Sequence, residues 1–256
     1  LNLRNVQDAY NDPGSPLTTY TARGFGVARN VDGKLLLTGS GATPEGLRPF
    51  LRRFDLTTLE TEELWRNSGE QLESVIDVLD DDGSEFLTFY ESPLNPGNIK
   101  LYGDGTERFI TDFPDPHPEL TGIKRELVTY QRADGVDLTA TLYLPPEYKE
   151  GDKLPVVVWA YPREFNDAAT ASQNRDSPYR FTRIGSYSHL FFLTQGYAVL
   201  DRAAMPVIGD DPETVNDSFI EQIVAAGQAA VDFTVDRGFG DGVRVGVGGH
   251  SYGAFL

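Results

Sequence analysis

The chain of 256 residues contains no cysteine. Disulfide bonds, a cysteine nucleophile and thiolate metal sites are therefore excluded. Basic residues are scarce as well, since 22 Lys and Arg stand against 39 Asp and Glu, for a formal net charge of -17. Nucleic acids and anionic lipids bind cationic surfaces, so neither is expected as a partner. Such an acidic surface is typical of soluble proteins in general, and it also occurs in salt-adapted ones.

Long apolar runs are missing too. No stretch approaches the roughly 18 apolar residues that a membrane-spanning helix needs, so no membrane partner is expected. The metal motif H-E-x-x-H does not occur, and Gly24-Phe25-Gly26 lacks the third glycine and the following helix of a nucleotide-binding loop. We therefore expect no metal and no cofactor. The compartment and the oligomeric state stay open.

Close to its end the chain carries a G-x-S-x-G motif at residues 249–253, GHSYG. The motif directly follows residues 243–247, where valines alternate and predict a strand. A nucleophile elbow requires this order, because a strand delivers the serine to a strained turn and a helix begins behind it. The motif alone arises by chance in roughly one chain of this length in ten. With the strand before it, Ser251 is predicted to be a catalytic nucleophile.

Residues 20–113 are predicted to form short β-strands with turns between them. Two stretches, 32–38 and 82–88, share the pattern D-G-x-x-[L/F]-L-T at an offset of 50 residues. In each, Asp-Gly favours a tight hairpin turn, and the residues after it favour a strand. Each repeat then continues with a connection rich in Gly and Pro and two more strands. The connections are 39–49 and 92–97, and the strands lie near 50–54, 61–65, 98–102 and 106–110.

Four strands per unit of about 50 residues are typical of β-propeller blades. Two blades cannot close a propeller, which takes about 4 to 8 of them, so we expect further blades before Leu1. A small β-sandwich is the alternative architecture for this half of the chain.

A stiff, proline-rich segment separates the two halves. Residues 113–118 read FPDPHP, and each proline fixes its own backbone and keeps the preceding residue out of the helical region. We therefore predict a boundary between one domain at 1–116 and another at 117–256. His117, inside the segment, is interpreted as a solvated linker residue.

From Glu126 onward the pattern becomes that of an α/β domain. A hairpin is expected to turn at Asp134-Gly135, and the apolar run 154–160 predicts a strand covered on both faces. Further strands are expected at 196–200 and 242–248. Strands that alternate with a helix imply right-handed crossovers and a parallel sheet.

A helix is expected between the last two of these strands. Ser218 and Glu221 have the spacing of a capping box at its start, and Gly238 is placed to stop it. Its buried face is predicted from residues spaced 4, 3 and 4 apart. These are Ile220, Val224, Gly227 and Val231.

A serine nucleophile needs a base within hydrogen-bond reach and a third group that orients this base. His250 adjoins Ser251, and neighbouring residues at a tight turn point apart. His189 lies in an aromatic stretch and is interpreted as a satisfied histidine of the core or surface. In the α/β-hydrolase order of serine, acid and histidine, both partners are expected after Leu256. Because no Met opens the chain either, we expect a segment of a longer protein, inactive by itself.

Several segments combine into a specific pattern. They are GGHSYGAF at 248–255, LPVVVWAYPREF at 154–165, YQRADGVDLTATLYLPPEY at 130–148, VNDSFIEQIVAAGQAAV at 215–231 and GSGATPEG at 39–46. Together they resemble the prolyl oligopeptidase family of serine peptidases, and within it the glutamyl endopeptidase group of bacteria and chloroplasts. The elbow motif alone occurs in many hydrolases, so it is the combination, which covers nearly the whole chain, that makes the resemblance specific.

This resemblance implies a β-propeller that caps an α/β-hydrolase domain. Residues 1–116 would be the C-terminal blades of the propeller, and residues 117–256 the incomplete peptidase domain, which ends at the elbow. The implied reaction is cleavage of peptide bonds in oligopeptides or unfolded chains through an acyl-serine intermediate. The propeller would then act as a size filter above a buried active site.

The resemblance also implies an oxyanion hole. The backbone N–H of Tyr252 would be one donor. In this family the second donor is a tyrosine hydroxyl, three residues before the phenylalanine or proline that ends its motif. Trp159 occupies that slot here, with Tyr161 two residues further on, and either side chain can donate. The alternative is that both rings pack at the edge of the sheet.

Specificity for glutamate before the scissile bond requires a cationic pocket, because a buried carboxylate must be paired. Four arginines follow the oxyanion strand in this otherwise acidic chain: Arg163, Arg175, Arg180 and Arg183. Arg175, and with it Arg163, are the candidate substrate-binding residues. Alternatively, the arginines belong to a solvated loop and pair with Asp167 and Asp176.

Two other functions fit the same residues. One is a carboxylic-ester hydrolase with the same elbow, although a lid rather than a propeller is the usual cover of such an enzyme. The other is a catalytically silent module that binds peptides or partner proteins. A later Asp and His, each on a loop after a strand, would favour catalysis over binding.

Overall fold

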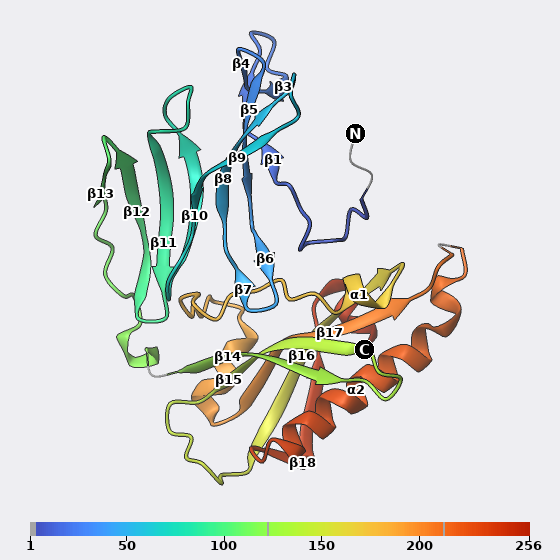
Figure 1. The fold of residues 1–256 in the computed structure, drawn as a ribbon. Helices are drawn as coiled ribbons and strands as arrows, with labels where there is room; N and C mark the ends of the chain where they lie inside the picture. Colours follow the sequence, from blue (N-terminus) through green and yellow to red (C-terminus); the bar gives the residue numbers. More distant parts are fainter. Residues whose placement is uncertain (1–3, 122, 212) are drawn as a thin grey trace. The chain divides into compact units, whose positions relative to one another are not determined.

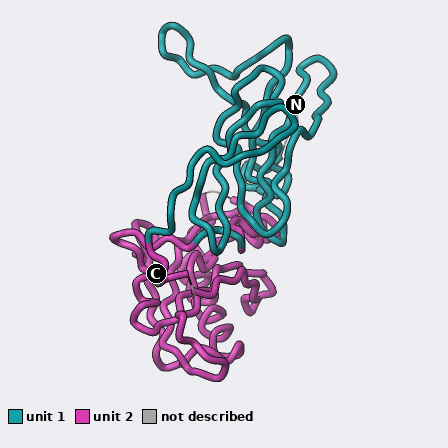
Figure 2. Tube along the Cα trace, turned by 90° about the vertical axis from the view of Figure 1, so that its left-hand side faces the viewer, with its two compact units in different colours: residues 1–116, 179–181 teal, residues 117–178, 182–256 magenta. Residues whose placement is uncertain are grey.

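The computed structural model describes residues 4–121, 123–211 and 213–256 (Figure 1). The chain divides into two compact units, which Figure 2 shows in different colours. Unit 1 contains residues 1–116 together with 179–181, and unit 2 contains 117–178 and 182–256. Among the described residues, no helix is both long and apolar enough to cross a membrane.

Unit 1 is built from two antiparallel sheets. The first has the order β1-β5-β8-β9, with β4 also paired to β5, and the second has the order β10-β11-β12-β13. The first sheet contains β1 (Ser15–Pro16), β4 (Asn30–Val31), β5 (Lys34–Gly39), β8 (Phe50–Asp55) and β9 (Thr61–Arg66). The second contains β10 (Leu72–Val78), β11 (Phe86–Ser92), β12 (Asn95–Gly103) and β13 (Thr106–Phe109). Two small ribbons join β2 (Thr18–Tyr20) to β3 (Gly26–Ala28) and β6 (Ala42–Thr43) to β7 (Gly46–Leu47).

The two Asp-Gly repeats turn the chain in different ways. Asp32 and Gly33 have φ angles of 49° and 77°, and they form the two-residue hairpin between β4 and β5 that the pattern predicts. Gly83 also has a positive φ, but it lies in a longer loop between β10 and β11. The carboxylate of Asp80 organises this loop by accepting the backbone N–H groups of Gly83 and Glu85. The shared pattern thus marks a turn in both places and a tight hairpin in only one.

The predicted connection 92–97 is wrong. Strand β11 runs to Ser92 and β12 begins at Asn95, so a short turn replaces it. The hydroxyl of Ser92 closes this turn by accepting both the backbone N–H and the side-chain amide of Asn95. The apolar core of unit 1 contains residues of both sheets, namely Leu36, Leu51, Val78 and Phe86.

Unit 2 is built around a mixed five-stranded sheet of the order β14-β15-β17-β16-β18. Strand β16 runs parallel to both β17 and β18, whereas β14, β15 and β17 pair antiparallel in sequence. The strands are β14 (Lys124–Gln131), β15 (Asp137–Leu144), β16 (Leu154–Phe165), β17 (Ala198–Ile208) and β18 (Gly240–Gly248). The helices are α1 (Ala168–Ala171) and α2 (Phe219–Asp236), with short 3-10 helices η1 (Pro118–Leu120), η2 (His189–Gln195), η3 (Val215–Ser218) and η4 (Ser251–Phe255).

The apolar run in β16 is covered on both faces, as its composition predicts. Val156 and Val158 belong to one buried cluster, and Val157 belongs to a second one on the opposite face. Helix α2 covers the first face by packing against β17 and β18 (Figure 1). Strands β16 and β17 extend beyond their predicted ends, and they carry the functional site at these extensions.

The predicted buried face of α2 is wrong. Ile220 and Val224 have 72% and 65% of their surface exposed. The face that packs on the sheet is formed mainly by small side chains, because these allow a close approach of helix and strands. Its buried residues are Ile223, Ala226, Ala229, Ala230 and Thr234.

The predicted capping box of α2 is also wrong. Ser218 precedes the helix, but its hydroxyl accepts no backbone N–H. The preceding turn η3 gives Ser218 φ and ψ of -106° and 20° instead of the extended geometry of a capping residue. Its hydroxyl accepts the side-chain amide of Gln222 instead, at 2.9 Å. Gly238, with a φ of 90°, follows the end of the helix where a stop is predicted.

Candidate active site

Ser251 lies at a strained turn between β18 and η4. Its φ is 56°, in the left-handed region that a serine rarely adopts, and the residue is exposed. The positions on either side of the turn, 249 and 253, have no room for a side chain, so both must be glycine. A Cβ on Gly249 would lie 2.4 Å from the carbonyl oxygen of Ala160, and one on Gly253 would lie 2.5 Å from the same oxygen. This strand, turn and helix have the local geometry that a nucleophile elbow requires.

Tyr252, directly behind the serine, is held by its own side chain. Its hydroxyl donates a hydrogen bond to the Glu164 carboxylate at 2.9 Å. Burial and this carboxylate raise the pKa of the Tyr252 phenol. The edge of its ring meets the ring of Tyr161 at a centroid distance of 5.9 Å. Tyr161 on β16 is thereby placed beside the turn that carries Ser251.

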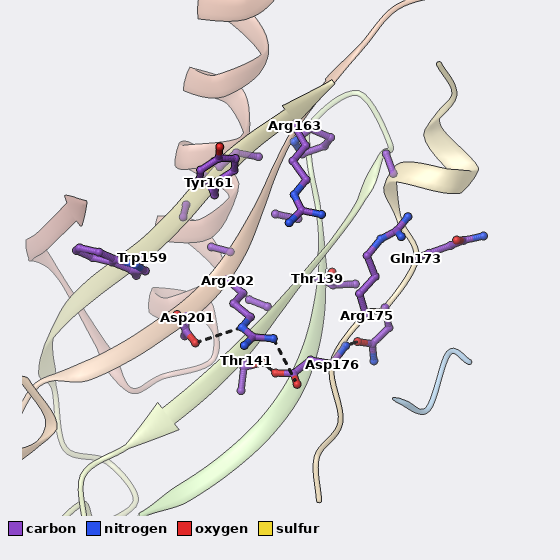
Figure 3. A pocket seen from close by; sticks show the side chains of 18 of the residues that line it. Thr139, Thr141, Trp159, Tyr161, Arg163, Gln173, Arg175, Asp176, Asp201 and Arg202 are labelled. Atoms are coloured by element: carbon purple, nitrogen blue, oxygen red, sulfur yellow. Dashed lines mark hydrogen bonds and ion pairs between the residues drawn. The ribbon is translucent and has the colours of Figure 1, made fainter. Parts of the chain in front are cut away.

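A pocket of about 680 Å³ opens within unit 2 next to this turn (Figure 3). It lies where the parallel strands β16 and β17 end, which is the usual place of a binding site in an α/β sheet. Trp159 and Tyr161 are two residues apart on β16 and both line the pocket, together with His250. The sequence positions predicted for the second oxyanion donor are therefore both at the pocket.

The ring of His189 packs against one face of the Trp159 indole. The two rings stack at a centroid distance of 4.5 Å with an angle of 6° between their planes. The Nε2 atom of His189 lies 2.7 Å from a carboxylate oxygen of Asp201, so His189 is a satisfied histidine, as predicted. The benzene edge of the indole lies against Gly248, and Figure 3 shows the indole nitrogen on the side that faces Asp201. Among the described residues, no histidine is hydrogen-bonded to the Ser251 hydroxyl.

The four predicted arginines separate into two groups. Arg163 and Arg175 line the pocket, as Figure 3 shows. Arg175 donates a hydrogen bond to the Thr170 carbonyl at 3.2 Å, and its guanidinium lies over the Phe165 ring. Arg180 instead pairs with the buried carboxylate of Glu91 within unit 1, at 3.3 Å. Arg183 is exposed and does not line this pocket.

The carboxylates that were considered as partners of these arginines also make contacts elsewhere. Asp167 caps α1 by accepting the backbone N–H of Thr170. Asp176 is buried and pairs with the guanidinium of Arg125. Burial disfavours its charged form, but Arg125, Arg202, the Ser177 N–H and Thr141 outweigh burial and hold the pKa of Asp176 below its ordinary value.

Two charged residues of the pocket, Asp201 and Arg202, were not predicted from the sequence. Both follow Leu200, where the predicted strand ends, so the rule that sites form at the carboxyl ends of parallel strands indicates them. Among the described residues, no group of three or more His, Asp or Glu side chains is arranged to hold a metal ion. The pocket offers aromatic rings, arginines, two carboxylates and one hydrogen-bonded histidine.

Known proteins are similar to this chain in sequence or in fold. A probable chloroplastic glutamyl endopeptidase of Oryza sativa subsp. japonica is 41% identical over an alignment of 271 positions, which covers 99% of the chain and 29% of the relative. A solved structure of an AtxE2 isopeptidase variant with astexin bound has a TM-score of 0.57 at 19% identity, over 96% of the chain and 40% of its own. A solved prolyl endopeptidase has a TM-score of 0.55 at 19% identity, over 94% of the chain and 32% of its own.

No protein-family model matches the chain. The chain spans less than a third of the length of the curated relative from rice. The two solved structures are related to it at the level of the fold.

Proposed function

Because the chain belongs to the prolyl oligopeptidase family, in its glutamyl endopeptidase group, we propose that the protein that carries it hydrolyses peptide bonds after Glu or Asp. The substrates are oligopeptides or unfolded chains, and the reaction passes through an acyl-serine intermediate. Solved neighbours are proteins that combine a β-propeller with a hydrolase domain. By this proposal the sheets of unit 1 are propeller blades, unit 2 is the first part of the α/β-hydrolase domain, and the catalytic acid and histidine lie outside this chain.

The geometry at Ser251 carries the proposal. A non-glycine residue with a φ of 56° between a parallel strand and a helical turn is uncommon, and Ser251 is an exposed residue. This conformation costs free energy, which a fold retains where the side chain must be presented to a reactant. Ser251 is therefore the proposed nucleophile.

The oxyanion hole is proposed to consist of the Tyr252 backbone N–H and a side chain of β16. Tyr161 is favoured for the second donor, since its ring lies against that of Tyr252 beside the elbow. The indole nitrogen of Trp159 faces Asp201 instead, away from the edge that packs on Gly248 (Figure 3). A preformed donor of this kind contributes roughly 3 to 4 kcal/mol to transition-state stabilisation.

A labelling experiment tests this function. We expect a fluorophosphonate probe to label the whole protein, and mass spectrometry to place the label on the peptide that contains Ser251. Peptides should then be cleaved with a higher kcat/KM than short esters of the same acyl group. A label at another residue would contradict the catalytic proposal, preference for the ester would favour a carboxylic-ester hydrolase, and no label with retained peptide binding would favour the silent module.

Arg175 is the first candidate for the recognition of glutamate. Its side chain lines the pocket. The guanidinium packs over the Phe165 ring and donates a hydrogen bond to the Thr170 carbonyl, and these contacts hold its position. We expect Arg175→Ala to lower the ratio of kcat/KM for a glutamyl over a glutaminyl peptide by about tenfold, because one charge-assisted hydrogen bond is lost. Arg237→Ala, at an exposed ion pair with Glu126, is the matched control. An unchanged ratio would exclude Arg175 as the carboxylate clamp.

A further inference from the structure

Arg202 has a backbone conformation that is unfavourable for its residue type. Its φ is 52°, in the left-handed region, which glycine adopts without strain and other residues adopt at a cost in free energy. The pairing of β16 with β17 explains the geometry. Trp159 is paired with Asp201 and the next residue, Ala160, with Ala203, so Arg202 is the extra residue of a β-bulge.

The bulge changes the direction of the Arg202 side chain. In a regular strand, successive side chains point to opposite faces. Here the consecutive residues Asp201 and Arg202 both line the pocket, and Figure 3 shows their side chains side by side in it. The strained residue therefore brings a guanidinium into the pocket that a regular β17 would direct elsewhere.

The nearby carboxylates have closer partners than this guanidinium. Asp176 already accepts hydrogen bonds from Thr141 and the Ser177 N–H and pairs with Arg125, and Asp201 is bonded to His189. Arg202 reaches these two carboxylates only at 3.6 and 3.9 Å. Among the residues that the structure describes, its guanidinium makes no hydrogen bond, and its side chain is 59% exposed.

The charges in the pocket favour an anionic ligand. Arg163, Arg175 and Arg202 line it, and Arg125 lies behind Asp176. The two carboxylates of the pocket, Asp176 and Asp201, are engaged by Arg125 and His189. In a chain with a net charge of -17, this local excess of cations is unusual. A guanidinium with open donors matches the planar carboxylate of an acidic side chain.

We infer that Arg202 is a specificity-determining residue whose guanidinium binds the side-chain carboxylate of the substrate. The inference rests on the proposed peptidase function. It adds a substrate-binding residue that lies in the pocket because of the β-bulge and that belongs to none of the motifs in the sequence. Because the ligand is the acidic side chain, the effect of Arg202 concerns the binding of glutamyl substrates and thus mainly their KM.

The variants Arg202→Gly, Arg202→Ala and Arg202→Lys in the whole protein separate specificity from strain. The substrates are two peptides with blocked termini that differ only in Glu or Gln before the scissile bond, so no terminal carboxylate contributes. We expect Arg202→Gly and Arg202→Ala to lower the Glu/Gln ratio of kcat/KM by about tenfold, through a higher KM for the glutamyl peptide. Arg202→Lys, which keeps the charge, should retain part of the preference.

Thermal unfolding provides the second readout. Glycine adopts a φ of 52° without strain, so Arg202→Gly should raise the Tm above that of Arg202→Ala. A lower ratio in a variant that is at least as stable as the parent cannot be attributed to misfolding. A Glu/Gln ratio of Arg202→Gly within about twofold of the parent value would overturn the inference. Failure of the underlying function is a different result, because neither peptide would then be cleaved and Ser251 would not be labelled.

Discussion

Ser251→Ala in the whole protein is expected to abolish fluorophosphonate labelling and to lower peptide turnover by about 10⁴-fold or more. The hydroxyl is the proposed attacking group, and without it the tetrahedral intermediate whose oxyanion the donors would stabilise no longer forms on the way to the acyl-enzyme. Single-turnover assays with a chromogenic peptide measure the loss. Tyr187→Ala, at an aromatic ring that is fully exposed on the surface, is the matched control and should keep both labelling and turnover.

The same position allows a test of strain. Ser251→Gly should be as inactive as Ser251→Ala but more stable, because glycine adopts a φ of 56° freely while alanine does not. The left-handed conformation costs a non-glycine residue roughly 1 to 2 kcal/mol, so the two variants should differ by about 2 to 8 °C in Tm. Equal Tm values would show that the turn is relaxed in solution, and the case for a nucleophile elbow would lose its main support.

Much of the fold could be predicted because its determinants are local. The Asp32-Gly33 hairpin depends on two adjacent residues, and the apolar run of β16 indicates a strand buried on both faces. The elbow motif is also short, although Gly249 and Gly253 are required by contacts with the carbonyl group of Ala160 on a distant strand. Such motifs are written within a few positions and can be recognised before their distant contacts are known.

Two of the predictions that were wrong concern helix α2, one its packing on distant strands and the other its start. The apolar residues Ile220 and Val224 suggested one face of α2, but the alanines of the other face permit the closer packing on β17. A pattern of large apolar residues does not reveal which face gains more from close contact. The capping box was likewise overridden by the 3-10 turn that directs the chain into the helix.

In the candidate site, too, residues near local motifs could be predicted, whereas a residue placed by strand register could not. Ser251, Trp159, Tyr161 and Arg175 come from local motifs or their immediate surroundings, and three of them line the pocket. Arg202 was missed because its direction depends on a bulge in the register of two strands about forty residues apart. No local pattern marks such a bulge, and an arginine at a left-handed position runs against the usual preference for glycine.

Arg125→Met is expected to destabilise unit 2 by about 3 to 5 kcal/mol, because it leaves a buried carboxylate without its main partner. The side chains of Arg125 and Asp176 are only 3% and 9% exposed. Arg125 also donates to the Tyr143 hydroxyl and to the Ser177 carbonyl, so it fastens the segment around Asp176 to β14 and β15. Denaturant unfolding of the whole protein, followed by a probe in unit 2, measures the change.

The control is Arg237→Met at the end of α2, where an exposed ion pair with Glu126 of β14 contributes about 0 to 1 kcal/mol. The effect at Arg125 should also depend on pH. The pKa of Asp176 is lowered in the folded protein, so its stabilising charge is present above pH 3.8 and is lost as the pH falls through the lower folded value. The stability difference between parent and Arg125→Met should therefore shrink in acid. A difference that is small at neutral pH, or unchanged in acid, would show that Asp176 does not depend on Arg125.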